Sequence, residues 1–377
     1  MAAMPIRRRG NGRGTHYNIM GIRQATEQRR DATLDIAKAL CITLMVVGHS
    51  GCPGYLDRFI YMFHMPCFFF ISGWLLSDKY LADLKTGLIR KVKGSYWPFV
   101  KWTLIFLLFH NSLAQLNVYD ASYSLREFAI KIVRIFTLTG GEQLLGGFWF
   151  LISLFWASVA SLLFLWFLKR IGKLTSIYIS GGVILALLIA VGEKWLPIHL
   201  PQQFGSQTMM ATAFYLTGYL SHRTDVMNHH GSSWMVSLLA IPAVAAMFLD
   251  LGMVTTTGFE IILYYIVAMC GIFGVLSISK WMSRHRISAF FKYVGDKTLY
   301  ILIFHFLAFK LVSFVYIACI GLPIEMLSQF PTIESVPSWL WVVYSIVGMA
   351  VSLLMWEVIN RISTKIGTIK SNKQNGI

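Results

Sequence analysis

Hydrophobic residues recur along this chain in long runs, and short polar or basic connections separate them. A helix that spans a bilayer needs about 17–25 residues that are mostly apolar. Runs that approach this length cover residues 34–50, 58–77, 95–114, 148–168, 174–192, 207–221, 234–250, 259–279, 297–318 and 338–360. The pattern predicts an all-α, polytopic integral membrane protein with about ten transmembrane helices.

The distribution of positive charge predicts the orientation of these helices. With the N-terminus placed inside, 25 of the 33 lysines and arginines lie in inner connections, 5 in outer connections and 3 within spans. Because positive residues concentrate on the cytoplasmic side of membrane proteins, we expect both termini to be cytoplasmic. This topology explains the net charge of +16, so the charge does not indicate a nucleic-acid partner.

The composition supports a membrane protein, since 56% of the residues are hydrophobic and only 13% are charged. Soluble domains have about 25% charged residues. We expect a disordered, basic cytoplasmic tail over residues 1–32, a membrane domain over 33–362 and a second cytoplasmic tail over 363–377. The N-terminal tail lacks the pattern of a secretory signal peptide, and Met20 is an alternative start.

The chain shows no familiar metal or nucleophile motif. Its five cysteines lack metal-ligand spacing, and no Ser-His-Asp pattern, P-loop or HExxH sequence is present. We therefore expect no metal. A disulfide between Cys52 and Cys319 stays open, because both can face outward.

Three ionisable residues lie on one side of the first predicted span. At 100° per residue, Lys38 and His49 fall within about 20° of each other and about 16 Å apart along the axis. Asp35 lies about 60° from Lys38 on the same side. Charges in contact with lipid cost about 2.5–3.5 kcal/mol each, so this side should face protein or a wet cavity. The alternative is that Asp35 and Lys38 pair at the membrane interface and extend toward water.

Three histidines in or beside the spans are candidates for proton transfer, because the pKa of histidine lies near neutrality. His49 sits at the outer end of the first span, and its alternative role is a hydrogen bond at the interface. His64 opens the second span at a similar depth; the alternative is a packing role. His305 lies in the middle of a span, where an ionisable residue indicates function, although a helix-to-helix hydrogen bond would also place it there.

Further polar and small residues have weaker signals. Arg90 and Lys93 lie in an inner connection and could clamp phosphates, although the positive-inside bias also explains them. Ser72 and the glycine after it permit close contact between helices. The long outer connection 115–147 ends in two Gly-Gly pairs before Trp149. It could shape an outward-facing acceptor site or form a helix that lies on the membrane.

Together these motifs resemble the acyltransferase family 3 membrane O-acyltransferases, in the branch that includes fucose 4-O-acetylase-like proteins. The first match is a basic residue, ten residues and a histidine, here Lys38 and His49. The others are the second-span motif 63–73, the inner pair Arg90 and Lys93, and the segments 148–151, 214–219 and 299–305. The resemblance runs from about residue 33 to 360, and six motifs in the right order make it specific.

The resemblance implies acetyl-CoA, or another acyl-CoA, as a cytoplasmic donor and a hydroxyl of a cell-surface or lipid-linked glycan as the acceptor. It implies that His49 is the catalytic base and that Lys38, Arg90 and Lys93 contact the donor. We take Asp35 and His64 as further catalytic candidates, and Ser72, Trp149 and His305 as other site candidates.

The resemblance also places the protein in the cell (inner or plasma) membrane, in contact with the lipid bilayer. Some family members carry a fused extracytoplasmic hydrolase-like domain, and this chain shows none. Transfer is then direct or needs a separate extracytoplasmic partner. The rival hypothesis is a multi-pass transporter or exporter of small or lipid-linked molecules, because intramembrane histidines and lysines also suit proton-coupled transport.

Overall fold

The computed structural model of the 377-residue chain describes residues 32–196, 205–226, 233–334 and 336–374. Every regular element in these residues is a helix, which confirms the expected all-α class. Six of the described helices are long and apolar enough to cross a membrane. They are Ala32–His49, Gln143–Arg170, Ser176–Trp195, Glu260–Met282, Thr298–Ile320 and Leu340–Lys365.

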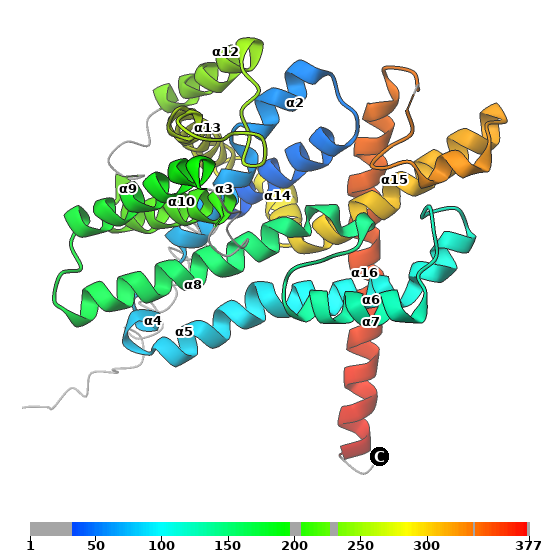
Figure 1. The fold of residues 1–377 in the computed structure, drawn as a ribbon, viewed down its shortest axis with the longest axis horizontal. Helices are drawn as coiled ribbons and strands as arrows, with labels where there is room; N and C mark the ends of the chain where they lie inside the picture. Colours follow the sequence, from blue (N-terminus) through cyan, green and yellow to red (C-terminus); the bar gives the residue numbers. More distant parts are fainter. Residues whose placement is uncertain (1–31, 197–204, 227–232, 335, 375–377) are drawn as a thin grey trace, which may run out of the picture.

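After the first helix, Ala32–His49, the described elements follow one another with short connections (Figure 1). They are α2 Gly54–Tyr61, α3 His64–Trp74, α4 Lys79–Ala82, α5 Leu84–Lys91, the π-helical turn η1 Val92–Tyr96, α6 Trp97–Gln115, α7 Leu125–Phe136, η2 Gln143–Phe148, α8 Trp149–Arg170, α9 Ser176–Gly192, η3 Glu193–Trp195, α10 Ser206–Arg223, η4 Ser233–Leu239, α12 Ala240–Phe248, α13 Glu260–Met282, α14 Ser288–Gly295, α15 Thr298–Ile320, η5 Ile324–Ser328 and α16 Leu340–Gln374.

The second predicted span, 58–77, is not one continuous helix. It is divided into α2, which ends at Tyr61, and α3, which begins at His64. Pro66 is the third residue of α3. Proline has no amide hydrogen to donate, and only the first turn of a helix tolerates that loss, so the helix has to begin again just before Pro66.

Two other features differ from the expected layout. The seventh run, 234–250, forms η4 and α12 and yields only a shorter apolar helix, Met235–Phe248. At the C-terminus, α16 continues to Gln374, so the predicted tail over residues 363–377 begins within this helix. The N-terminal tail lies outside the described residues apart from Ala32. The count of ten spans and the cytoplasmic side of the termini stay predictions.

The closest contact between helices joins α3 and α10. A Cβ atom on Gly73 would lie 1.8 Å from the carbonyl oxygen of Tyr215, and one on Gly218 would lie 1.9 Å from that of Phe70. The two backbones therefore touch on both sides of the crossing, which only glycine allows. Ser72 donates a hydrogen bond to the carbonyl of Phe68 within its own helix. The close packing expected at Ser72 and Gly73 is confirmed.

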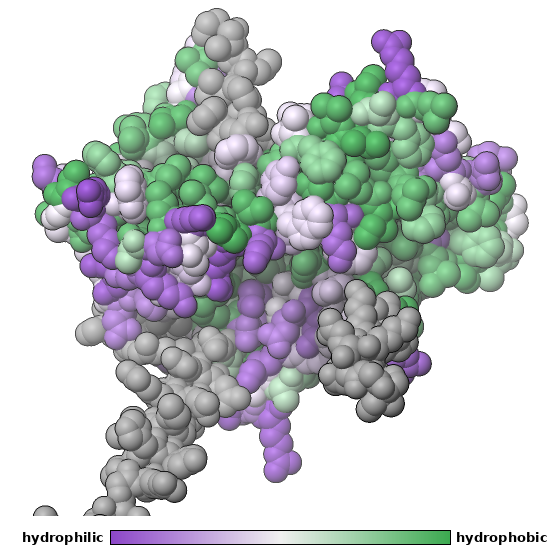
Figure 2. Space-filling view, turned by 90° about the horizontal axis from the view of Figure 1, so that it is seen from below, coloured by the Kyte–Doolittle hydropathy of each residue, from purple (hydrophilic) through white to green (hydrophobic). Residues whose placement is uncertain are grey.

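The outside of the helical body is largely apolar. Large hydrophobic side chains are exposed along α9, α13 and α16, including Leu188, Ile266 and Ile346, as lipid-facing surfaces require. The view from below shows hydrophilic side chains gathered on part of the face, beside broad hydrophobic areas (Figure 2). In Figure 1, α4 and α5 lie at the lower left, and the loop between α15 and α16 lies at the upper right.

The α3–α10 contact generates a test of the fold. In Gly73→Ala, the added methyl group must push the two helices apart, which typically costs about 1–3 kcal/mol. We expect a lower melting temperature for the purified protein in detergent or lipid. Gly181→Ala is the matched control, because Gly181 lies exposed on α9 and a Cβ atom there would have no heavy atom of another residue within 4 Å. Equal melting temperatures for both variants would contradict the crossing.

The orientation is tested by reporter fusions after residues 85, 130, 325 and 370. We expect inside signals at 85 and 370 and outside signals at 130 and 325, because of the 25-to-5 distribution of positive residues. An outside signal at 85 or 370, or an inside signal at 130 or 325, would reject the ten-span topology.

Candidate active site

Two of the candidate histidines meet in the structure. The Nδ1 atom of His49 lies 3.0 Å from the Nε2 atom of His305, although 256 positions separate them in the chain. Their rings are stacked, with centroids 5.2 Å apart and 20° between the planes. His305 is fully buried, whereas His49 is only partly buried. The pair therefore has one enclosed member and one that is partly open.

The fold brings these two residues together by aligning two helices. His49 is the last residue of the first helix, and His305 lies in the first half of α15. At the opposite end of the first helix, a Cβ atom on Gly295 would lie 2.0 Å from the carbonyl oxygen of Asp35. Gly295 ends α14, three positions before α15 begins. Residue numbers therefore increase in the same direction along both segments, so the first helix runs parallel to the segment 295–305.

His305 also bonds to its own helix. Its Nδ1 atom lies 3.0 Å from the carbonyl oxygen of Ile301 and 3.1 Å from that of Leu302. Both ring nitrogens of His305 are thus engaged, one with the backbone and one with His49. The helix-to-helix hydrogen bond that sequence reasoning gave as the alternative for His305 is present, and it is made to the candidate base. The functional role of His305 stays a prediction.

Aromatic rings from the outer segments surround the pair of histidines. Phe306 stacks on His49 with centroids 4.9 Å apart, and Phe330 packs against Phe306 at 4.6 Å. A Cβ atom on Gly146 would lie 3.2 Å from Phe330. The connection between α15 and α16 and the end of the outer connection 115–147 therefore meet beside the histidines.

The outer connection 115–147 has two parts. Its end, at Gly146, lies beside Phe330 near the two histidines, and the role of this segment in an acceptor site stays a prediction. Its middle forms α7, which begins with a capping box at Ser124 and Glu127. The apolar side of α7 is exposed, with Leu125 at 91% and Val133 at 62%. This exposed apolar face fits the alternative of a helix that lies on the membrane.

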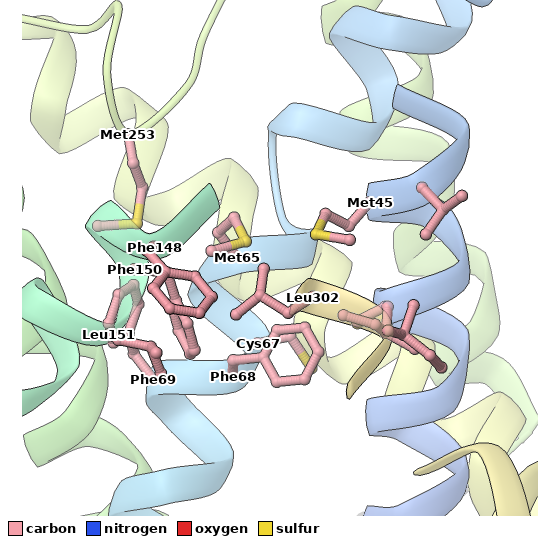
Figure 3. Close-up of a cluster of buried hydrophobic side chains, with 14 of the residues drawn as sticks. Met45, Met65, Cys67, Phe68, Phe69, Phe148, Phe150, Leu151, Met253 and Leu302 are labelled. Carbon is pink, nitrogen blue, oxygen red and sulfur yellow. The ribbon is translucent and has the colours of Figure 1, made fainter. Parts of the chain in front are cut away.

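An apolar cluster lies one helical turn below the histidines. Figure 3 shows Met45 of the first helix and Met65 of α3 facing one another, with Leu302 of α15 beside Phe68. Met45 is four residues before His49, and Leu302 is three residues before His305. All four side chains of this cluster are buried. The region beneath the pair of histidines is therefore made of hydrocarbon and thioether groups, which are more compatible with an acyl chain or thioester than with a charged group.

His64 lies in the same region without touching His49 through a hydrogen bond. It is buried, and its Nδ1 atom lies 2.7 Å from the carbonyl oxygen of Ile60. The ring of Tyr61 is 5.1 Å from that of His64 and 6.2 Å from that of His49. The structure thus places His64 behind Tyr61, in a position that fits its packing alternative as well as a supporting role.

Asp35 and Lys38 lie at the other end of the first helix. The Nζ atom of Lys38 is 2.6 Å from the Oδ1 atom of Asp35, and the two side chains are 24% and 16% exposed. Fourteen residues separate Asp35 from His49, or about 21 Å along a helix. Asp35 therefore cannot contact His49, and its geometry matches the alternative of a pair at the interface.

Two of the three predicted donor contacts, Arg90 and Lys93, lie on α5 and η1, and both side chains are exposed. Arg90 donates a hydrogen bond to the hydroxyl of Tyr80, and Lys93 lies in η1. Between them, Lys91 donates to the hydroxyl of Tyr215 at 2.6 Å. Burial of this amine lowers the pKa of Lys91 to about 8. Sequence reasoning missed Lys91, because helical spacing alone does not show which of the neighbouring cations turns inward.

Two more observations concern residues near the outer end. Trp149 is the first residue of α8, is partly buried and packs against the main apolar cluster. Asp57 of α2, which lies just before the predicted second span 58–77, was not among the candidates. Its Oδ1 atom lies 3.7 Å from the position of a Cβ on Gly48, next to His49. Burial and the nearby Asp250 raise the pKa of Asp57 to about 6.

The described residues contain no cluster of three or more histidine, cysteine, aspartate or glutamate side chains arranged to hold a metal. The chemistry available at this site is that of a histidine with a partly open ring, supported by a second histidine and bordered by apolar groups. Such an arrangement can accept a proton from a hydroxyl group.

Comparison with known proteins identifies a family for the chain. The sequence profile of an acyltransferase domain matches residues 31–357. Two curated proteins named Nodulation protein NolL are similar to the chain. The one from Mesorhizobium japonicum is 28% identical over 173 residues, which are 42% of this chain and 42% of the relative. The one from Sinorhizobium fredii is 27% identical over 244 residues, which are 60% of this chain and 59% of the relative.

The chain therefore spans about two fifths to three fifths of the length of these curated relatives. No solved structure matches it. The matched profile covers most of the chain and includes His49, His305 and the inner basic residues. The resemblance drawn from the motifs is confirmed, and the chain belongs to the acyltransferase family 3.

Proposed function

We propose that this protein is a membrane O-acyltransferase that moves an acyl group, acetyl in the simplest case, from cytoplasmic acyl-CoA to a hydroxyl of a cell-surface or lipid-linked glycan. The observation that carries the proposal is the contact of His49 with His305 in a chain of the acyltransferase family. A partly open histidine at the end of a membrane helix, above an apolar cluster, suits a base that meets a hydroxyl and a thioester.

In the proposed reaction, His49 removes the proton from the acceptor hydroxyl. The oxygen attacks the carbonyl carbon of the thioester, and the tetrahedral intermediate collapses as the bond between carbon and sulfur breaks. The coenzyme A thiolate leaves and takes the proton from His49, so the products are an ester and free coenzyme A. The hydroxyl must come within about 3 Å of His49.

The donor is proposed to bind at the inner end, where Lys38, Arg90 and Lys93 supply positive charge for the phosphates of coenzyme A. This end is about 16 Å from His49 along the first helix. The long arm of coenzyme A separates its phosphates from its thioester, so a donor held at the inner end can present the thioester deeper in the protein. Arg90 uses one guanidinium nitrogen for Tyr80, which leaves its other N–H groups for a phosphate.

The acceptor is proposed to approach from the outer side, near Phe330 and Gly146, which border the pair of histidines. Transfer is either direct to the glycan or passes through a separate extracytoplasmic partner. We place the protein in the cell membrane, where a cytoplasmic donor and a surface acceptor can be served from opposite sides.

A transporter remains the rival, and one observation weighs against it. The buried amine of Lys310 donates hydrogen bonds to the carbonyl oxygens of Leu327, Ser328 and Gln329 at 2.5–3.0 Å. Lys310 is thus fixed to the C-terminal end of η5, rather than placed along a path for protons.

The first test removes the base. We expect His49→Ala to lose about 10²–10⁴-fold in the rate of acyl transfer, which is the usual contribution of a general base. Acyl-CoA binding should persist, because the phosphates bind at the far end of the first helix. The measurement is release of coenzyme A and labelled ester by purified protein in lipid, with labelled acetyl-CoA and crude glycan acceptor.

His285→Ala is the matched control, since His285 is exposed and its ring contacts are within its own segment, to Trp281. It should keep wild-type transfer. Normal transfer by His49→Ala would refute the role of His49. Absence of coenzyme A release by the wild type across a broad acceptor panel would favour the transporter.

The second test concerns the donor. We expect the double variant Arg90→Ala and Lys93→Ala to weaken acyl-CoA binding, and we expect added salt to weaken wild-type binding, because exposed charges are screened. The control is the double variant Arg284→Ala and Arg286→Ala, which removes two exposed cations from another inner connection. If both double variants bind acyl-CoA as the wild type does, the positive-inside bias alone explains Arg90 and Lys93.

A further inference from the structure

We infer that His305 is a positioning residue for the proposed reaction, because it fixes His49 in the tautomer whose Nε2 atom carries the free lone pair. The inference rests on the proposed function and deepens it. It is carried by the pattern of contacts along one line, from the backbone of α15 through His305 to His49.

The first step assigns the proton on His305. Its Nδ1 atom faces two backbone carbonyl oxygens, of Ile301 and Leu302. A carbonyl oxygen only accepts hydrogen bonds, so Nδ1 must carry the hydrogen. In a neutral imidazole, the other nitrogen then has a lone pair. The Nε2 atom of His305 is therefore an acceptor.

The second step concerns the charge of His305. The ring is fully buried and is packed against Phe306 at 3.9 Å and Phe309 at 5.7 Å. The ion pairs among the described residues do not include His305. A buried charge without a partner is costly, so the neutral ring is favoured and the assignment of Nε2 as an acceptor holds.

The third step passes to His49. Because Nε2 of His305 accepts, Nδ1 of His49 must donate across the 3.0 Å contact. Nε2 of His49 is then unprotonated, and it has no hydrogen-bond partner among the described residues. His49 is only partly buried, whereas His305 is enclosed. Of the two histidines, His49 is therefore the one whose free lone pair a substrate can reach. A general base needs this tautomer, since the opposite one would present a hydrogen to the hydroxyl.

The same contacts hold the ring in place. Phe306 stacks on His49 with centroids 4.9 Å apart and packs against His305, in a tilted arrangement, at 3.9 Å. Both histidine rings therefore have little freedom to turn. His305 thus resembles the orienting member of a catalytic triad, where loss of the correct tautomer costs about 10⁴-fold in rate while the geometry stays intact. If the hydrogen bond only held the two helices together, the reaction rate would not depend on which nitrogen of His49 is free.

Two amide substitutions separate these roles. In His305→Gln, the amide oxygen can reach the place of Nε2 and accept from His49. In His305→Asn, the shorter amide can take the place of Nδ1 and donate to Ile301, but it does not reach His49. The two variants are similar in polarity. The glutamine keeps the hydrogen bond to His49, and the asparagine keeps the hydrogen bond to the backbone of α15.

We expect His305→Gln to stay within about tenfold of the wild-type kcat and His305→Asn to lose about 10²–10⁴-fold. KM for acyl-CoA should change little in either variant, because the donor's phosphates bind elsewhere. Tyr344→Phe is the matched control. It removes a buried hydrogen bond of 2.9 Å between α16 and α15, to Ser313, and should keep wild-type kcat. Equal kcat for the Gln and Asn variants would overturn the inference.

A measurement independent of activity reads the tautomer. Nitrogen-15 NMR of histidine-labelled protein in lipid distinguishes protonated from unprotonated ring nitrogens, and the His49→Ala spectrum identifies the signals of His49. We expect a protonated Nδ1 and an unprotonated Nε2 in the wild type, and a mixture of tautomers in His305→Asn. A protonated Nε2 in the wild type would overturn the inference. Absence of transfer by the wild type would instead refute the proposed function, while the NMR result would still decide the tautomer.

Discussion

The hydrogen bond between His49 and His305 is the constraint on which the arrangement of the site depends. Polar groups at membrane depth must find partners inside the protein, because lipid offers none. The bond satisfies one nitrogen of each ring and joins the end of the first helix to the first half of α15. At the other end of the first helix, the backbone of Asp35 contacts Gly295, the last residue of α14, three positions before α15 begins. These two contacts set the register in which the site forms.

The rest of the fold supports the two ends of this pair. The crossing of α3 and α10 at Gly73 and Gly218 lies within the helical body. The buried Lys310 binds the connection between α15 and α16 back to α15. That connection brings Phe330 beside the histidines. The inner basic residues lie on α5 and η1, far along the chain from His305. The basic residues of this region and the aromatic rings around the two histidines thus lie on different elements of the fold.

The sequence predicted the features that depend on local pattern. Hydrophobic runs predicted an all-helical membrane protein, the motifs predicted the family, and Gly73 predicted a close helix crossing. The pairing of His49 with His305 was beyond a single sequence, because it depends on which helices pack together across 256 positions. The break before His64 was missed because apolar residues continue through it, and only the cost of a proline inside a helix sets the new start. Lys91 and Asp57 were missed because burial, not sequence spacing, changes their pKa values.

The most direct test of the central claim is the mass of surface glycans from cells that carry the wild-type protein, His49→Ala or no protein. The account predicts an added acyl mass, that of an acetyl ester in the simplest case, with the wild type. This mass should disappear after mild alkaline treatment and should be absent with His49→Ala and without the protein. The same glycan masses in all three cultures, or an acyl ester that persists with His49→Ala, would contradict the account.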